Sequence, residues 1–479
     1  MHAFKGTLIT SPTLEGIRPA LRDHETMILT ILDALLERFE RNRDYPFIDT
    51  KLNIVTGADF ADAADPSRDF RGKSAVFGWI QGRGLEALVG HARWLPNASV
   101  LTRAQRDDRT ARLTKMIRDV FERMESLRAR NAGRLYFTMT PEGEPFEIDD
   151  SGRRRPVNVA DTPMNFSDLF YAKGMLAAAS FLGLPSKVEE AKTSFREVAA
   201  DIAEDRFVSD QVQFDPKNKV RPVPGRFSHG PRMIAIGGCS LFAELTGEEE
   251  WFEIGERFIR HILEKHVNFG QLPELELHDY FEFIGRDGRP WKDGENVLSD
   301  PGHALEFIGL ASRVLLLLRT RTRKSPSQEE LLRRCVDVFP PIFLKNFENG
   351  FNRRIGGICK AFDLISRRPF NSDMPWWNLP EGIRAAAELL LLLSGDSGKN
   401  REILQALADC SNGFFTRFVN PRVHLMAYQT IDEEGRPCEI IPATPDADPL
   451  YHTGLSIIDF LNCFRRLPRR RSRPRAGKQ

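Results

Sequence analysis

Six short clusters of polar and aromatic residues recur along the chain, each at the start of an apolar helical run. They are Trp79–Arg83, Asn165–Asp168, His229–Arg232, Pro301–Glu306, Trp376–Glu381 and Leu450–His452. The clusters follow one another at intervals of roughly 65 to 85 residues, which favours a repeated helix–loop–helix unit. If every second helix begins at the same end of a ring, all six clusters meet at one mouth. Arg, His, Glu and Trp side chains gathered there would form a site for a polar, flat-faced ligand such as a sugar.

The fourth cluster contains an imidazole and a carboxylate at helical spacing. His303 and Glu306 are three residues apart, so they share one face of a helix. A carboxylate beside an imidazole raises its basicity and fixes its tautomer, as a general base requires. The alternative is a histidine at a helix start beside an incidental glutamate, and the pair alone does not decide between the two.

The last cluster places a second histidine, His452, at the start of the final predicted helix. A single histidine in such a position is more often structural than catalytic. In a ring, however, His452 would face the same cavity as His303. Two imidazoles on opposite sides of a substrate carbon could remove a proton from one face and return it to the other, which is the arrangement an epimerase needs.

Arg83 lies in the first turns of a predicted apolar helix. A buried arginine without a partner is costly, so we expect either an internal carboxylate or a ligand beside it. In a site, the guanidinium would hold a substrate carbonyl oxygen and stabilise an enediolate as negative charge develops. An ion pair inside the ring is the alternative interpretation.

Further candidates for ligand contact come from the same clusters. Adjacent tryptophans point in different directions on a helix, so we expect one of Trp376 and Trp377 against a sugar face and the other in the core. Asp168 can also be interpreted as an acid in the first turn of a helix. The predicted ligand-contacting residues are Trp79, Asp168, Arg232, Trp376, Trp377, Glu381 and Tyr451.

Twelve helices are predicted to position these side chains, because apolar residues recur at helical spacing. Gly and Pro punctuation, such as Gly183-Leu184-Pro185, supports their boundaries. Loops after the even-numbered helices are mostly short, whereas loops leading into them are long. The predicted helices cover residues 15–41, 79–95, 104–131, 165–183, 186–207, 230–247, 248–267, 302–320, 327–347, 377–395, 399–418 and 450–466.

The long loops contain strand-like segments, at residues 134–140, 145–148, 272–284, 356–365, 424–430 and 438–441. Thr140–Gly143 and Asp432–Gly435 read as hairpin turns between such segments. Insertions in repeat proteins collect on the binding face, and the even helices are the more continuously apolar. The sequence therefore predicts an all-α fold, an (α/α)6 barrel of about twelve helices with short β-hairpins in the loops at the active-site end. An open α-solenoid is the alternative.

The composition is that of a globular protein with a sizeable core, with 41% hydrophobic and 28% charged residues. Lys and Arg number 68 and Asp and Glu 67, a net charge of +1, so we expect no nucleic-acid partner. The six cysteines form no C-x-x-C pair, and the other histidines lack ligand spacing, so neither a metal nor a cofactor is expected.

One domain over residues 1–466 and a basic, solvated tail over residues 467–479 are expected. The first residues show no signal-peptide pattern. The longest apolar stretches, near Ala311–Leu318 and Ala385–Leu393, are shorter than a bilayer span. These features lead us to expect a cytoplasmic protein without a membrane partner.

Four of the clusters together resemble a known family. The motifs W-I-Q-G-R, P-G-H-A-L-E, W-W-N-L-P-E and L-Y-H, in this order, are similar to those of the N-acylglucosamine 2-epimerase family, which includes cellobiose 2-epimerases and mannose or sulfoquinovose isomerases. The resemblance covers roughly residues 55–465. It implies an (α/α)6 barrel that acts on a reducing sugar by cofactor-independent proton transfer at C2.

The resemblance also implies a role for each matching residue. His303 and His452 would form the acid/base pair, and Arg83 would assist the substrate oxygens. Glu306 would support its histidine. Trp376 and Trp377 would wall the pocket. Relatives further imply a homodimer.

The chain departs from the family pattern on the third inner helix. Many relatives carry an N-x-H-x-H-x-x-E segment where this chain has Gly230–Gly237, without the histidine pair or the glutamate. This apolar run is closer in character to the N-acylglucosamine epimerase branch. Gly309, Leu379 and Leu455 also replace a usual Trp, Gln and Arg.

Several functions follow as hypotheses. The first is a sugar 2-epimerase for an N-acylglucosamine- or N-acylmannosamine-like substrate, with an aldose–ketose isomerase on mannose-type sugars as its alternative. The second is a glycoside hydrolase or lyase, which would recruit two carboxylates from Glu306, Glu381 and Asp168. The third is a sugar-binding or partner-binding relative without catalysis.

Overall fold

The computed structural model describes residues 6–468, except residues 66–68, 150, 212–222, 394–399, 441–443 and 445. Within this part of the chain a short helix, α1 (Leu14–Ile17), precedes twelve longer ones. These are α2 (Leu21–Arg41), α3 (Gly78–Trp94), α4 (Arg103–Arg130), α5 (Phe166–Leu182), α6 (Pro185–Ala203), α7 (Gly230–Thr246), α8 (Glu249–Lys265), α9 (Pro301–Thr320), α10 (Pro326–Gly350), α11 (Asn378–Leu393), α12 (Asn400–Gly413) and α13 (Ser456–Arg466).

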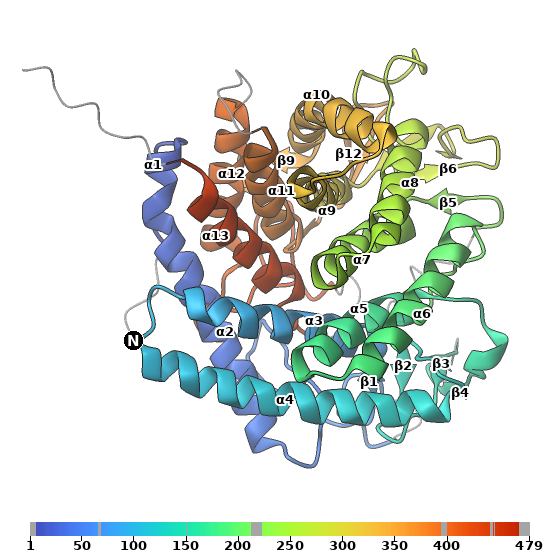
Figure 1. Ribbon diagram of the computed structural model, residues 1–479, viewed down its shortest axis with the longest axis vertical. Helices are drawn as coiled ribbons and strands as arrows, with labels where there is room; N and C mark the ends of the chain where they lie inside the picture. The colour runs from blue at the N-terminus through green and yellow to red at the C-terminus, as the bar shows by residue number, and fades with distance from the viewer. Residues whose placement is uncertain are drawn as a thin grey trace, which may run out of the picture.

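Every second helix belongs to an inner ring. Helices α3, α5, α7, α9, α11 and α13 pack against one another in this order, and α13 returns to α3. The other long helices surround this ring (Figure 1). The arrangement follows from the residue pattern, because α11 is buried on all sides whereas α4 buries a single stripe that includes Leu113, Val120 and Met124. The predicted (α/α)6 barrel is confirmed.

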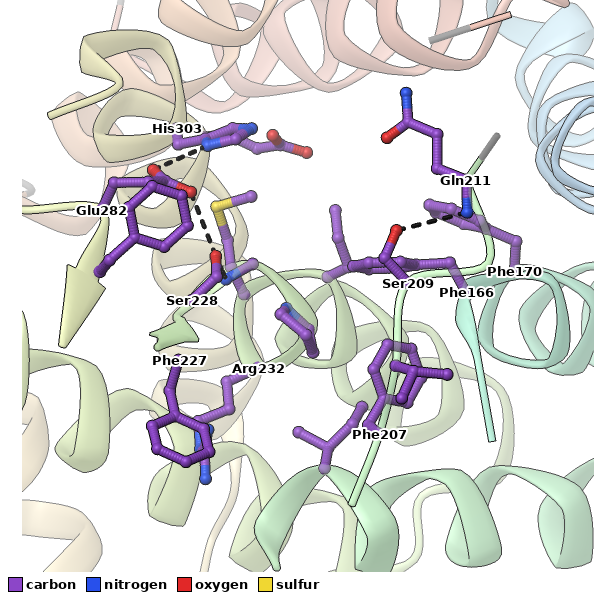
Figure 2. A pocket seen from close by; sticks show the side chains of 18 of the residues that line it. Phe166, Phe170, Phe207, Ser209, Gln211, Phe227, Ser228, Arg232, Glu282 and His303 are labelled. Atoms are coloured by element: carbon purple, nitrogen blue, oxygen red, sulfur yellow. Dashed lines mark hydrogen bonds and ion pairs between the residues drawn. The ribbon is translucent and has the colours of Figure 1, made fainter. Parts of the chain in front are cut away.

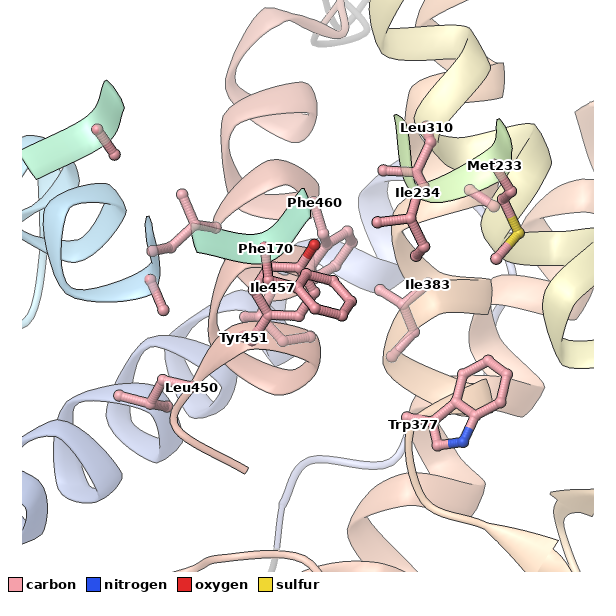
Figure 3. Packing of buried hydrophobic residues seen from close by; sticks show 14 of the residues in the cluster. Phe170, Met233, Ile234, Leu310, Trp377, Ile383, Leu450, Tyr451, Ile457 and Phe460 are labelled. Carbon is pink, nitrogen blue, oxygen red and sulfur yellow. The ribbon is translucent and has the colours of Figure 1, made fainter. Parts of the chain in front are cut away.

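The apolar side chains of the inner helices meet in the middle of the ring. Figure 3 shows Phe170, Ile234, Ile383 and Ile457, which come from four inner helices, converging there. Capping boxes begin α4, α5 and α10, in which a Thr, Asn or Ser side chain accepts a hydrogen bond from a backbone N–H three residues later. Local side chains therefore fix where these three helices begin.

Short antiparallel strands link neighbouring hairpins around one end of the ring. The strand before α3 pairs with the strand before α5, and the same holds for α7 with α9 and for α11 with α13. These pairs are β1 (Val76–Phe77) with β2 (Thr138–Met139), β5 (Phe227–Ser228) with β6 (Phe283–Ile284), and β13 (Met374–Pro375) with β14 (Thr430–Ile431). The strands thus connect the starts of the inner helices.

The remaining strands form hairpins in the same loops. They are β3 (Phe146–Ile148) with β4 (Arg154–Pro156), β9 (Phe351–Asn352) with β10 (Gly357–Ile358), and a four-stranded sheet in the order β12 (Arg368–Asn371), β11 (Ala361–Asp363), β8 (Asn296–Ser299), β7 (Lys292–Asp293). Both predicted turns are present, since Gly143 N donates to Thr140 O and Gly435 N donates to Asp432 O, each at 2.9 Å.

Some predicted boundaries differ from the structure. The predicted strand 272–284 is reduced to β6, because the side-chain amide of Asn268 donates to the carbonyls of Leu272, Leu275 and Glu276 and fixes that segment as a loop. The predicted helix 186–207 ends at Ala203. As a result Phe207 lies beyond the helix, at the mouth of the ring.

The ring is closed where the first and last helices meet. Asn412, near the end of α12, exchanges two hydrogen bonds with the backbone of Ile9, at 2.8 and 3.0 Å. Arg18 donates to the carbonyls of Phe464 and Leu467, at 3.2 and 3.3 Å. Leu467, the first residue of the predicted tail, is buried. Residues 469–479 of that tail lie outside the described residues.

By length and composition alone, α9 could cross a membrane, with a mean hydropathy of 1.3 and 83% of the tested window buried inside the structure. A fully packed inner helix meets the same criterion, so the observation is weak evidence. The helix is longer than the apolar stretch Ala311–Leu318 noted in the sequence.

Two glycines allow α3 and α5 to approach closely. A Cβ atom on Gly82 would lie 2.8 Å from backbone atoms of Phe170 and Tyr171. A Cβ on Gly174 would collide with the carbonyl oxygen of Gly82. Helix backbones cannot move apart locally without disturbing the packed ring, so this crossing depends on the absence of side chains.

We predict that Gly82→Ala lowers the free energy of unfolding by about 1 to 3 kcal/mol, because the new methyl group meets backbone atoms. Gly90→Ala, on the same helix, is the matched control. Its Cβ would meet only the side-chain end of Leu455, and the better helix propensity of Ala, about 1 kcal/mol, offsets that contact. Urea denaturation of both variants measures the difference, and equal stability of the two would contradict the close crossing.

Candidate functional site

A cavity of about 500 Å³ opens at the strand-linked end of the inner ring. Each of the six inner helices contributes at least one side chain to its wall, from its first turns or from the residues just before it. In chain order the contributors include Arg83, Phe170, Arg232, His303, Trp377 and His452. The six sequence clusters therefore meet at one mouth, as their spacing predicts.

His303 is held by carboxylates on the loop side of the cavity. Its Nδ1 atom lies 3.0 Å from Glu282 Oε2 and 3.5 Å from Asp300 Oδ2. Asp300 also caps α9, where its side chain accepts hydrogen bonds from the backbone N–H groups of Gly302 and His303. Because Nδ1 is engaged, Nε2 is the ring nitrogen available to a molecule in the cavity.

Glu282 contacts a second imidazole. The same Oε2 atom lies 2.9 Å from Nε2 of His229, and the Ser228 hydroxyl donates to Oε1 at 3.1 Å (Figure 2). Burial alone would raise the pKa of Glu282, but the imidazoles of His229 and His303 outweigh burial and hold it well below its usual range. Glu282 is therefore a carboxylate anion fixed from both sides.

His452 has a carboxylate partner of its own. It lies on a π-helical turn (Tyr451–Leu455), and its Nδ1 atom is 2.9 Å from Glu381 Oε1. The Ser456 hydroxyl donates to the same oxygen at 3.2 Å, and Arg384 contacts the other oxygen. Burial raises the pKa of Glu381 to about 7.

The imidazoles of His303 and His452 differ in charge at neutral pH. Burial lowers the pKa of His303, but the charges of Asp300 and Glu282 outweigh it and raise the value to about 9. Burial, followed by the positive charge of Arg83, lowers the pKa of His452 to about 4. At pH 7 His303 is thus a cation and His452 a neutral base, a difference typical of an acid and a base in one site.

Trp377 contacts both imidazoles. Its ring centre lies 5.1 Å from that of His303 and 5.7 Å from that of His452. Trp376 meets His452 edge-on at 6.2 Å. Both tryptophans border the cavity, and both are also buried in the hydrophobic core.

Arg83 lies against aromatic rings. Its guanidinium carbon is 4.0 Å from the ring centre of Phe170, 5.1 Å from that of Trp79 and 5.4 Å from that of Tyr451. It makes no salt bridge with any described residue, and its buried Nε atom has no hydrogen-bond partner there. Burial lowers the pKa of Arg83. Of the two expected explanations, an internal carboxylate and a ligand, this arrangement favours the ligand.

Glu306 does not hydrogen-bond to His303, although the helical spacing suggested that pair. Its carboxylate instead lies in a group with Glu381 and His452, whose nearest donor atoms are all within 4.8 Å of one another. The partner of His303 is Glu282, because the loop before α9 brings that carboxylate to Nδ1. Burial, and then repulsion by Glu381, raises the pKa of Glu306, which also borders the cavity.

The other predicted contact residues fall into two groups. Trp79 and Arg232 border the cavity, where Trp79 Nε1 donates to Asp210 at 2.9 Å and Arg232 pairs with Asp205 at 2.7 Å. Tyr451 and Glu381 lie behind the cavity wall. Tyr451 accepts a hydrogen bond of 2.6 Å from Lys173, and Glu381 contacts His452.

Asp168 lies outside the cavity wall. Its carboxylate pairs with Arg134 at 2.6 Å and accepts a hydrogen bond from the backbone N–H of Asn165, as part of the capping box of α5. Asp168 is thus an acid in the first turn of a helix, which was the alternative interpretation, and the structure does not place it among the residues that border the cavity.

Sequence reasoning missed Glu282 and Lys360. Glu282 stands between Phe281 and Phe283, in the loop that precedes the P-G-H motif, and an acid between two aromatic residues was the available signal. Lys360 donates to Asp300 at 2.6 Å and lies 5.5 Å from the Trp377 ring centre. Its segment has no periodicity that would have indicated a site.

Among the described residues, two groups of side chains have the composition of metal ligands. They are His229, Glu282 and His303, and Glu306, Glu381 and His452, each with its donor atoms within 4.8 Å of one another. Nitrogen and carboxylate oxygen donors suit a divalent transition metal. In both groups an imidazole nitrogen and a carboxylate oxygen already lie at hydrogen-bond distance.

The family model described as N-acylglucosamine 2-epimerase (GlcNAc 2-epimerase) matches residues 157–455, more than half of the chain. The chain belongs to this family. The match includes the segments of His303, Trp377 and His452 and thus confirms the resemblance seen in the motifs. A search of curated protein sequences gives no match.

Solved epimerase and isomerase structures share the fold. A sugar epimerase from a ruminal bacterium is 13% identical with a TM-score of 0.62, covering 94% of this chain and 98% of its own. Cellobiose 2-epimerase from Bacillus thermoamylovorans B4167 is 12% identical with a TM-score of 0.58, covering 90% and 99%. A D-mannose isomerase is 13% identical with a TM-score of 0.58, covering 90% and 97%.

We predict that Glu282→Gln lowers the pKa of His303 from about 9 by about 1 to 3 pH units, because it removes an adjacent negative charge that favours the protonated ring. Histidine-selective NMR titration measures this, with the His303 signal assigned by its loss in His303→Asn. Glu142→Gln, which removes the charge of an exposed glutamate outside the cavity wall, is the control. An unchanged titration in Glu282→Gln would contradict the assigned pairing.

Proposed function

We propose that this protein is a sugar 2-epimerase that acts on an N-acylglucosamine- or N-acylmannosamine-like substrate by cofactor-independent proton transfer at C2. The observation that carries the proposal is a pair of imidazoles in one cavity, each fixed at Nδ1 by its own carboxylate and held in opposite protonation states. Family membership supports carbohydrate epimerase or isomerase chemistry.

In the proposed reaction His452, the neutral imidazole, removes the proton at C2 of the open-chain sugar. Negative charge then moves to the carbonyl oxygen, where Arg83 stabilises the enediolate, since this guanidinium lies against aromatic rings and its Nε atom has no hydrogen-bond partner among the described residues. His303, as the cation, returns a proton to the opposite face of C2. The net reaction exchanges one C2 hydrogen and inverts that carbon.

The same residues support one alternative within the family. If the proton returns to C1 rather than C2, the product is a ketose, and the protein is an aldose–ketose isomerase for mannose-type sugars. The hydrolase hypothesis is less well supported, because Glu381 is engaged by His452 and Arg384 rather than free to act on a glycosidic bond. A sugar-binding protein without catalysis is the remaining alternative.

We predict loss of the C2 proton signal when the protein is incubated in D₂O with a substrate from the set N-acetylmannosamine, N-acetylglucosamine, mannose, glucose and cellobiose. Proton NMR records the exchange, and the product spectrum separates epimer from ketose. The rate should fall below about pH 4, where His452 becomes protonated, and above about pH 9, where His303 loses its proton.

His303→Asn and His452→Asn should each reduce this exchange by at least about 100-fold while the fold persists. His424→Asn is the matched control, since His424 is exposed and its backbone has φ +49°, which Asn tolerates. Retained exchange in either test variant would remove that histidine from the mechanism. No exchange with any sugar of the set would favour a protein that binds without reacting.

A further inference from the structure

The cavity has an aromatic wall on the side away from His303. Phe166 stacks on Phe170 with ring centres 5.9 Å apart and meets Phe207 edge-on at 4.9 Å. Trp79 extends this wall, with its ring centre 5.2 Å from that of Phe166. Figure 2 shows His303 and Glu282 at one side of the pocket and the three phenylalanines at the other.

The apolar wall continues onto the third inner helix. Ile234 and Met233, on α7, border the same cavity, as does Ile202 from α6. This is the segment in which the chain departs from the N-x-H-x-H-x-x-E pattern. The departure therefore places the apolar side chains of Met233 and Ile234 inside the pocket, rather than in a part of the helix that only packs against neighbours.

Three of the polar groups beside this wall, on Trp79, Ser167 and Arg232, already have carboxylate partners. The indole N–H of Trp79 donates to Asp210, which also accepts from Ser167. Arg232 pairs with Asp205 at 2.7 Å. A sugar hydroxyl pressed against this wall would exchange its hydrogen bonds to water for apolar contacts, which is unfavourable, whereas an apolar group would gain by leaving water.

The volume of the cavity also favours a ligand that carries an apolar group. A pocket of about 500 Å³ is within the range that encloses drug-sized ligands, and a bare six-carbon sugar would leave much of it to water. If the sugar carbon that reacts lies between His303 and His452, the remaining space faces the aromatic wall.

We propose that the substrate is a reducing sugar that carries an apolar acyl or aryl substituent larger than acetyl, and that Phe166, Phe207 and Ile234 form the subsite for this substituent. The inference rests on the proposed function, since it takes the two imidazoles as the place of the reacting carbon. It adds the class of substrate that the geometry of this cavity selects.

Isothermal titration calorimetry with two series of ligands tests the subsite directly. One series is N-acylmannosamines and the other 6-O-acylglucoses, each with acetyl, butanoyl and hexanoyl groups. We expect the dissociation constant in one series to fall about three- to fourfold for each added methylene group. A flat dependence on chain length in both series would overturn the proposal.

Two variants of opposite volume change keep this test independent of folding. Phe207→Ala removes part of the wall and Ile234→Trp fills the subsite, and both should abolish the gain with chain length. Phe370→Ala, at an exposed phenylalanine on β12 with 53% of its surface accessible, should keep that gain. Thermal unfolding of all three variants is recorded in parallel, and a chain-length gain retained by both folded test variants would also overturn the proposal.

The outcomes separate the two proposals. Tighter binding of the longer acyl sugars without deuterium uptake at C2 would support the subsite and contradict the epimerase. Deuterium uptake from unsubstituted sugars, with no gain on acylation, would support the epimerase and contradict the subsite.

Discussion

Closing helical hairpins into a ring forces every second helix to begin at the same end, and the site depends on that constraint. The strand pairs around the mouth reinforce it, because each links the loop before one inner helix to the loop before the next. Residues far apart in sequence are thereby brought together by the arrangement of the helices. Glu381 and His452, which are 71 positions apart in the sequence, meet in this way.

The ring of helices also explains why the two imidazole–carboxylate pairs have imidazoles of different charge. Both His303 and His452 contact a buried carboxylate through Nδ1, yet their pKa values move in opposite directions. His303 faces a second carboxylate, that of Asp300, whereas His452 lies near the guanidinium of Arg83. The surroundings supplied by neighbouring helices, rather than the imidazole–carboxylate contact itself, decide which ring is charged.

Helices and their order could be predicted from the sequence, because apolar periodicity over long segments is a local signal. The meeting of six clusters followed from their spacing. Partners of individual side chains could not be predicted in the same way. Helical spacing showed that His303 and Glu306 share a face, but the carboxylate that reaches Nδ1 belongs to Glu282, in a loop 21 positions earlier in the chain. Likewise, the residue type of Asp168 did not distinguish a helix cap from a ligand contact, since a carboxylate at a helix start can serve as either.

The closure of the ring has a consequence for the order in which the protein is assembled. The last inner helix, α13, is joined to the first part of the chain through Arg18, and α12 is joined to it through the contact of Ile9 with Asn412. Chains are made from the N-terminus, and folding can begin during synthesis. The Glu282–His303 pair would thus be in place while Trp377 and His452, which come later in the chain, are still missing. A growing chain would hold one half of the site, and the proposed proton transfer would have to await the final hairpin.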